Sequence, residues 1–280
     1  MTIEKILEAM KNGFIDESLD LERLIYEFGS QHFVEEMLNN MGNVNSLVRE
    51  NIIGVFYRLS VEEHLSLEER IGVLDTCLSE SHLFNGVGSK GDDSVFWRSY
   101  SSLTVGYFVD GDVKLPESQY ILALDKGIEY MSREVDRRGF VAGKGWGHAV
   151  AHGADMLCAF ARNPAFPIKY ADKMLDCIKF HITSRDSFVD GDETRLAEIV
   201  PILLNKGFGE SAVQNWIESL LPSIKTLRYT DAHYQDMRVL FNIKYFLISL
   251  HYVLGEKSVG ESLMNFISEY VPVMSKRAHS

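Results

Sequence analysis

The spacing of apolar residues constrains the fold of this 280-residue chain more than any other feature. Apolar side chains recur at three- and four-residue intervals almost everywhere, and the alternation typical of strands is almost absent. Helix-starting residues agree with this pattern, since Ser66 precedes two glutamates and Pro116 and Pro167 each open an apolar run. Pro201 lies inside a helical pattern, so the helix around it should kink or split near Val200. We therefore expect an all-α fold, with helices near residues 3–11, 20–28, 31–39, 44–59, 66–79, 94–109, 117–133, 146–161, 167–183, 192–204, 209–220, 232–252 and 258–274.

The expected helices alternate in character along the chain. Plainly amphipathic helices are separated by helices that carry polar residues near their starts, and the second kind recurs about every 40–50 residues. This period is typical of two-helix HEAT or armadillo units, in which one helix of each pair lines a concave surface. We expect a right-handed α–α superhelix of such hairpins over residues 46–280. Residues 1–45 would form an N-terminal helical cap, which could be continuous with the rest.

Composition limits the partners and the compartment. A net charge of −12 without a basic stripe argues against nucleic acid, because binding to phosphates needs clustered Lys and Arg. The apolar stretch from Val239 to Leu254 is interrupted by polar residues, and we expect it to be too short and too polar to cross a membrane. Cys77, Cys158 and Cys177 have no paired spacing, which favours the reducing cytoplasm. The oligomeric state is open at this stage.

One segment, RGFVAGKGWGHAVAHGAD from Arg138 to Asp155, departs from its surroundings. Its glycines predict a mobile loop that leads into a helix beginning at Trp146. On that helix His148, His152 and Asp155 follow one another at steps of four and three residues, which places them on one face. The other helix positions are mostly Gly and Ala, so neighbouring backbones should approach closely. Two imidazoles and a carboxylate in a crowded place need hydrogen bonds or a ligand.

Three interpretations of His148, His152 and Asp155 stay open. They could hold Zn²⁺, Fe²⁺ or Mn²⁺ as a divalent cofactor, although the HExxH pattern of zinc proteases is absent. They could form a structural network with arginines of neighbouring helices. They could also line a metal-free pocket in which a histidine transfers a proton or grips a ligand.

Other polar helix starts should converge with this segment if their helices line the same concave surface. Arg98, Arg195 and Arg238 each follow acidic residues, which favours buried arginine–carboxylate bridges over a cluster of arginines aimed at an anion. Asp93, Asp192 and Asp231 would then be helix caps. Trp146 could wall the pocket. The predicted ligand-binding groove consists of Arg98, Trp146, His148, His152, Asp155, Glu193, Arg195, His233, Asp236 and Arg238.

Three stretches of the sequence resemble an uncharacterised bacterial family, domain of unknown function 2785. They are Phe96-Trp97-Arg98-Ser99, Asp136-Arg137-Arg138-Gly139 followed by Lys144 to Asp155, and Asp192-Glu193-Thr194-Arg195-Leu196-Ala197. The GWGHAVAHGAD string is the specific part of the resemblance, which extends over most of the chain after about residue 50. The resemblance implies a helical-repeat protein and brings no established activity.

Two functions follow as expectations. The first is a cytoplasmic binding protein that uses a polar concave groove for a peptide, a protein or a small anionic ligand. The alternative is an enzyme, a metal-dependent hydrolase or an oxygenase, centred on His148, His152 and Asp155. No complete catalytic signature is present, which favours the first, whereas the titratable residues gathered near Trp146 keep the second open.

Overall fold

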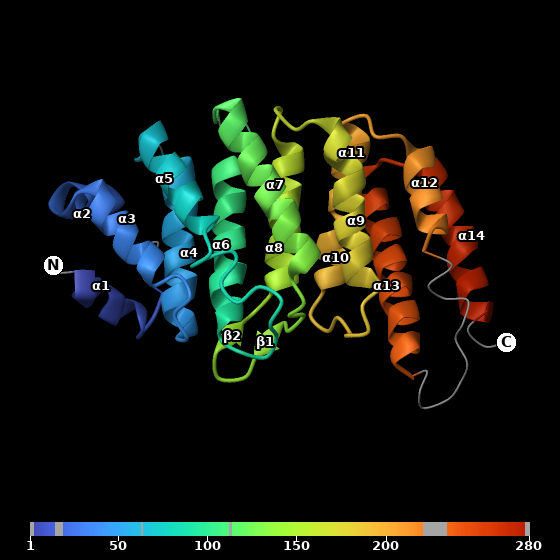
Figure 1. Ribbon diagram of the computed structural model, residues 1–280, viewed down its shortest axis with the longest axis horizontal. Coiled ribbons are helices and arrows are strands. Elements are labelled where there is room, and N and C mark those ends of the chain that lie inside the picture. Colours follow the sequence, from blue (N-terminus) through green and yellow to red (C-terminus); the bar gives the residue numbers. More distant parts are fainter. Residues whose placement is uncertain (1–2, 15–18, 63, 112–113, 221–233, 278–280) are drawn as a thin grey trace. The chain divides into compact units, whose positions relative to one another are not determined.

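The computed structural model describes residues 3–14, 19–62, 64–111, 114–220 and 234–277. These residues are mostly helical, with one small two-stranded sheet (Figure 1). The chain divides into two compact units, Met1–Ala165 and Phe166–Ser280. The predicted boundary near residue 45 and the predicted superhelix both stay predictions.

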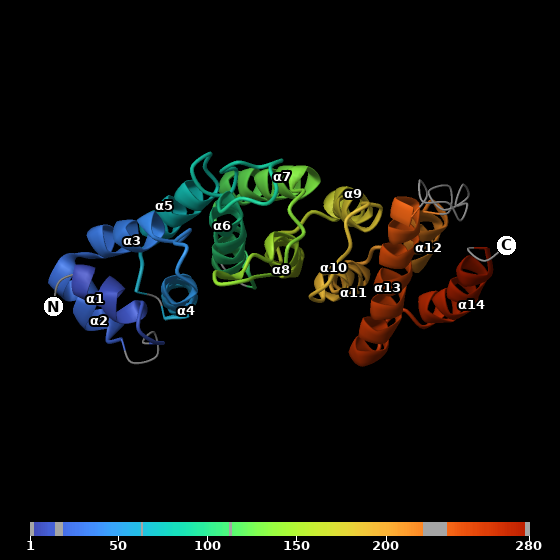
Figure 2. The same cartoon turned by 90° about the horizontal axis from the view of Figure 1, so that it is seen from below.

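The first unit consists of two sets of helices and a hairpin. Figure 2 shows α3, α5 and α7 along one side and α4, α6 and α8 along the other. Helix α6 packs against both α4 and α8, while α5 and α7 cover α6 and α8. The elements are α1 (Ile3–Met10), α2 (Leu21–Phe28), α3 (Ser30–Asn39), α4 (Ser46–Val61), α5 (Leu67–Cys77), α6 (Ser94–Val109), α7 (Glu117–Arg133), β1 (Phe140–Val141), β2 (Gly145–Trp146) and α8 (Ala149–Arg162).

Small residues bring α8 close to its neighbours, as the sequence predicts. A Cβ atom added at Gly153 would lie 2.1 Å from the sulfur of Met131 on α7. A Cβ atom at Gly106 on α6 would lie 3.4 Å from the Cα atom of Met156. Most of α8 is fully buried as a result. This crowding fixes the helix at whose start the histidines lie.

The second unit consists of η2 (Ile168–Tyr170), α9 (Ala171–Ile182), α10 (Asp192–Ala197), α11 (Ile199–Asn205), α12 (Glu210–Glu218), α13 (Tyr234–Lys257) and α14 (Glu261–Arg277). Helix α13 packs against α9, α10, α11 and α14. The predicted split near Pro201 is confirmed, since α10 ends at Ala197, four residues earlier. A proline ring collides with the carbonyl group four residues before it, which accounts for the position of the break.

The structure confirms one predicted helix cap and corrects others. Ser66 does cap α5 through a reciprocal pair of hydrogen bonds with Glu69. Asp93 makes no capping hydrogen bond, because Asp92 accepts the backbone N–H of Ser94 instead. Asp192 lies inside α10, where Gly191 occupies the cap, and Asp231 lies outside the described residues.

Helix α13 is longer than the apolar stretch expected between Val239 and Leu254. Its residues Met237–Lys257 have the length of a membrane span and, over their most apolar stretch, the mean hydropathy of one, 1.2. Half of that stretch is buried in the protein. A core helix of a soluble protein meets the same criteria, because its apolar side packs against other helices.

Candidate functional site

The predicted loop and helix start form a β-hairpin, which corrects the sequence-based expectation. Phe140 pairs with Trp146 and Val141 with Gly145, so Trp146 belongs to a strand and α8 begins three residues later. His148 caps α8 in the left-handed conformation, with φ 46° and ψ 34°. Its backbone N–H donates to the carbonyl of Arg138 at 3.0 Å, which closes the hairpin onto the helix. His148 therefore precedes the helix instead of lying on its face.

Five aromatic and imidazole rings, which we call the ring cluster, follow one another across this region: Phe140, Trp146, His148, His152 and Tyr100. The indole of Trp146 stacks on the imidazole of His148, with centroids 4.3 Å apart, and meets the edge of Phe140 at 5.2 Å. His148 meets His152 edge to face at 5.7 Å, and His152 meets Tyr100 at 5.6 Å. Phe140 and Trp146, at one end, are 59% and 39% exposed, whereas Tyr100 at the other end is buried.

Helix α6 supplies the base of the ring cluster. The Nδ1 atom of His152 lies 2.8 Å from the hydroxyl of Ser99, which is buried. The next residue, Tyr100, donates its hydroxyl proton to Glu50 on α4. Burial, followed by the charge of Glu50, raises the pKa of Tyr100 well above its ordinary value. The phenol is therefore held neutral as a hydrogen-bond donor.

A buried arginine that the sequence analysis did not single out supports the hairpin. Arg49 of α4 is fully buried, and its guanidinium lies 3.8 Å from the ring centroid of Phe96 and 5.0 Å from that of Tyr100. It donates to the carbonyl of Lys144 in the hairpin turn. The Lys144 ammonium in turn pairs with Asp93 at 2.6 Å. No local pattern singles out Arg49, because Arg58 lies in the same stretch and the acceptor of Arg49 at Lys144 is 95 residues away.

Arg98 is buried, so it does not line a groove in this structure. Its Nε atom pairs with Glu134 at 2.5 Å, and both side chains are fully inaccessible. Burial alone would lower the pKa of Arg98, yet the Glu134 carboxylate holds it above its ordinary value. This geometry agrees with the structural interpretation of the arginine and identifies Glu134 as its carboxylate partner.

The remaining predicted groove residues belong to the second unit, apart from Asp155, which follows His152 by one turn of α8. Glu193 and the exposed Arg195 lie on α10, and Arg238 lies on α13 with Nη1 3.5 Å from the carbonyl of Arg185. His233 and the side chain of Asp236 lie outside the described residues. A groove shared by the other nine residues therefore stays a prediction.

The metal site also stays a prediction. Within the described part of the chain, no three His, Cys, Asp or Glu side chains are placed to hold a metal ion together. The Nδ1 atom of His152 is already engaged with the hydroxyl of Ser99.

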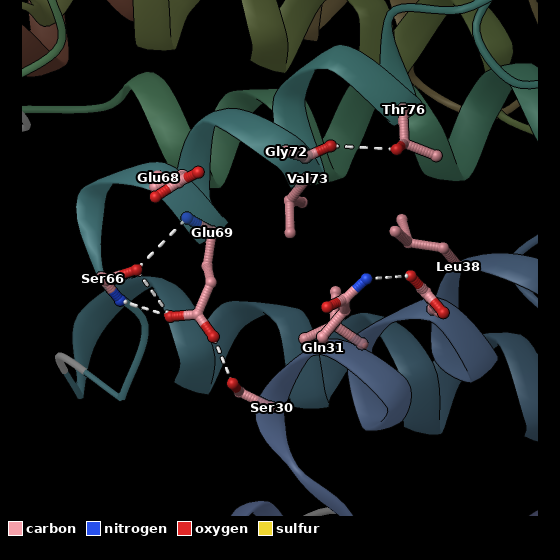
Figure 3. Close-up of a pocket in the computed structure, with 11 residues that line it drawn as sticks. Ser30, Gln31, Leu38, Ser66, Glu68, Glu69, Gly72, Val73 and Thr76 are labelled. Atoms are coloured by element: carbon pink, nitrogen blue, oxygen red, sulfur yellow. Dashed lines mark hydrogen bonds between the residues drawn. The ribbon is translucent and has the colours of Figure 1, made fainter.

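A separate groove lies between α3 and α5 and was not predicted (Figure 3). It has a volume of about 690 Å³, with Val34, Leu38 and Val73 among its apolar lining and Gln31 and Glu68 among its polar lining. Glu69 accepts hydrogen bonds from Ser66 and, across the groove, from the Ser30 hydroxyl. No local pattern reveals this groove, because its residues come from helices separated by α4.

The chain belongs to a family described as a protein of unknown function (DUF2785), whose model matches residues 83–252. The match includes the hairpin, all of α8 and most of α13, and it begins after the groove between α3 and α5. No curated protein and no solved structure matches the chain.

Proposed function

We propose that this family member is a binding protein that presents the ring cluster to a peptide or a segment of another protein. The observation that carries the proposal is the exposure of Phe140 and Trp146 on a hairpin tied to α8 and α4. Exposed aromatic side chains that lie together in one patch mark candidate interaction sites, and aromatic residues dominate the energetics of interfaces that use them. The ring cluster also lies within the residues that match the family.

The bracing of the hairpin supports this function. Stacking on His148 fixes the indole of Trp146, and Arg49 fixes the turn at Lys144. A surface whose side chains are already ordered loses less conformational entropy when it binds.

A small anion is the less favoured ligand. Three cations near the ring cluster are already paired with carboxylates within the protein: Arg138 with Asp136 at 2.6 Å, Lys144 with Asp93, and Arg98 with Glu134. An anion would have to compete with these carboxylates for each cation.

Photo-crosslinking in the source cell tests the proposal. A benzophenone amino acid at Phe140 should give a discrete crosslinked product, which is lost in a Trp146→Ala background. The matched control places the same probe at Leu122, an exposed apolar residue of α7, and should not give that product. Once the partner is purified, calorimetry should show that Trp146→Ala weakens binding by roughly tenfold or more. An identical product from both probe positions, or one that persists in Trp146→Ala, would refute the proposal.

We also propose the finer fold, an α–α superhelix of the HEAT or armadillo type with a concave groove. The pairing of α5 with α6 and of α7 with α8 supports it, as does the lateral packing of α4, α6 and α8. X-ray scattering from a dilute solution should give a radius of gyration clearly above about 19 Å, the value for a compact chain of this length. A value near 19 Å would contradict the superhelix.

The enzyme alternative rests on a metal at His148, His152 and Asp155. Elemental analysis of protein purified without a histidine tag tests it directly. Stoichiometric metal that His152→Ala removes, while the circular dichroism of the helices is unchanged, would support the alternative. Metal-free wild-type protein would remove this form of it.

A further inference from the structure

Helix α13 carries a row of exposed apolar side chains that its own unit does not cover. Phe241, Tyr245, Ile248 and Tyr252 are 39%, 53%, 47% and 60% exposed, and we call them the outer stripe. The opposite side of the helix, which includes Ile243, Phe246, Leu247 and Leu250, is fully buried against other helices. The helix is therefore apolar on two opposite sides, and a contiguous exposed apolar row of this kind marks an interaction surface.

The spacing of the outer stripe indicates the kind of partner. Its members follow at intervals of four, three and four residues, which is the a/d spacing of a coiled-coil seam. The order of the intervals, four, three and four, is the same from either end of the helix. A second α13 laid antiparallel would therefore place Phe241 opposite Tyr252, and Tyr245 opposite Ile248, in one register.

We propose that the outer stripe is the interface of a homodimer, in which α13 of one copy packs antiparallel against α13 of the other about a two-fold axis. A two-fold axis needs a self-complementary surface, and the outer stripe provides one. The proposal is independent of the ring cluster and of what that cluster binds.

Charges at the two ends of the outer stripe fit this orientation. Arg238 lies one turn before Phe241, and Glu256 lies one turn after Tyr252, where it accepts the hydroxyl of Tyr252 at 2.7 Å. In the antiparallel register Arg238 of each copy lies within one residue of Glu256 of the other. A parallel pair would instead place Arg238 beside Arg238 and Glu256 beside Glu256, which repel each other.

A cavity beside Ile248 provides room for the opposing side chain. It has a volume of about 280 Å³, lies between α13 and α14, and includes Ile267, Val271 and Pro272 in its lining. Tyr245 of the second copy lies opposite Ile248 in the proposed register, so its ring would enter this cavity as a knob enters a hole.

Sedimentation equilibrium of the purified full chain tests the dimer. We expect the average mass to rise from monomer to dimer with concentration, because the outer stripe spans less than two heptads and should give a modest affinity. Tyr245→Asp places a charge in the seam and should weaken association roughly tenfold or more, with the helical circular dichroism unchanged. Leu122→Asp, at an apolar residue of α7 that is 47% exposed, should leave association unchanged. A wild-type chain that is monomeric throughout, or a dimer that Tyr245→Asp does not weaken, would overturn the proposal.

Charge reversal tests the orientation. Arg238→Glu and Glu256→Arg should each weaken the dimer by about threefold to tenfold, because two-fold symmetry repeats every lost pair. The double variant should restore association. Within one copy the two residues are 18 positions apart, about 27 Å along the helix, so the restoration cannot arise inside one chain. Single variants that weaken association without restoration in the double variant would refute the antiparallel register.

Discussion

At the scale of single residues, the interior of the first unit is organised by charges that water does not reach. Glu134 receives Arg98 on both carboxylate oxygens, and its Oε1 atom also accepts the backbone N–H of Asp136 at 2.7 Å. Arg98 in addition donates to the carbonyl of Asn85 at 2.8 Å. Arg98 thus connects α6 to the segment after α7 through its ion pair with Glu134, and to the loop before α6 through its hydrogen bond to Asn85. Removing either charge leaves the other buried without compensation.

We therefore expect Glu134→Gln to destabilise the protein by about 3 kcal/mol, because the Arg98 charge loses its counterion. Glu129→Gln is the matched control, since Glu129 pairs with Arg133 on the surface of α7, just before Glu134. Exposed pairs contribute at most about 1 kcal/mol, so this variant should unfold close to wild type. Guanidinium unfolding followed by circular dichroism measures the free energy of unfolding of both variants. Equal losses in the two variants would mean that the buried pair has no special role.

The backbone of His148 offers a second test at this scale. Its positive φ is unusual for a residue with a side chain, and Asn tolerates that conformation far better than Val does. His148→Asn and His148→Val both remove the stacking on Trp146, so the difference between them reports the backbone. We expect His148→Val to be less stable than His148→Asn by about 1–2 kcal/mol in denaturant unfolding. Equal stability would show that the hairpin adapts without the left-handed residue.

Local signals predicted some residues well and missed others for a physical reason. The capping role of Ser66 follows from residues within one turn, and the structure confirms it. A buried carboxylate partner was expected for Arg98, but its identity was not, because Glu134 is 36 residues away and no local pattern points to it. Arg49 was missed for the same reason, since its acceptor at Lys144 is 95 residues away.

At the scale of elements, the start of α5 also determines how α3 is held. Glu69 closes the capping box with Ser66 and accepts the hydroxyl of Ser30 at the start of α3 (Figure 3). The hydrogen bond from Ser30, followed by those from Ser66, lowers the pKa of Glu69 below its ordinary value. A carboxyl with a lowered folded-state pKa stabilises the fold above its unfolded pKa, about 4.3, and loses that contribution as the pH falls through its folded pKa.

We expect Glu69→Gln to lower the stability by about 1 kcal/mol at neutral pH, through the weakened cap. The difference from wild type should shrink as the pH falls below about 4, where the wild-type carboxyl protonates as well. Glu68→Gln, at the adjacent exposed position, is the control and should change stability little at either pH. Thermal melting at several pH values measures the stability difference between each variant and the wild type. A Glu69→Gln deficit that does not depend on pH would show that the carboxylate charge is not responsible.

Elements were predicted well where periodicity or proline decides them. The split helix at Pro201 follows from proline geometry alone. The β-hairpin at residues 140–146 was missed because each of its strands has two residues, too few to show an alternation. Its glycines were interpreted as a mobile loop, whereas Gly143 and Gly145 supply the positive φ angles, 74° and 82°, that the turn requires.

At the scale of the whole molecule, the chain forms two compact units that divide after Ala165. The division falls in the sequence Asn163-Pro164-Ala165-Phe166-Pro167, where two prolines limit helix formation. Periodicity alone does not locate such a division, because helices of both units have the same spacing. The sequence-based expectation, which stays a prediction, is one continuous array over residues 46–280, in which a local disturbance spreads to neighbouring repeats.

A reciprocal pair of core substitutions distinguishes two cooperative units from one array. Leu157→Ala on α8 and Leu250→Ala on α13 each remove a fully buried leucine side chain, at a cost of about 2–5 kcal/mol. We expect each variant to raise amide hydrogen exchange, measured by mass spectrometry, across its own unit and to leave the other close to wild type, because each unit has its own core. Faster exchange along the entire chain in both variants would indicate a single cooperative array. If Leu157→Ala accelerates exchange from residue 46 onward but spares residues 1–45, the N-terminal segment is a separate cap, since its own contacts would then hold it independently of α8.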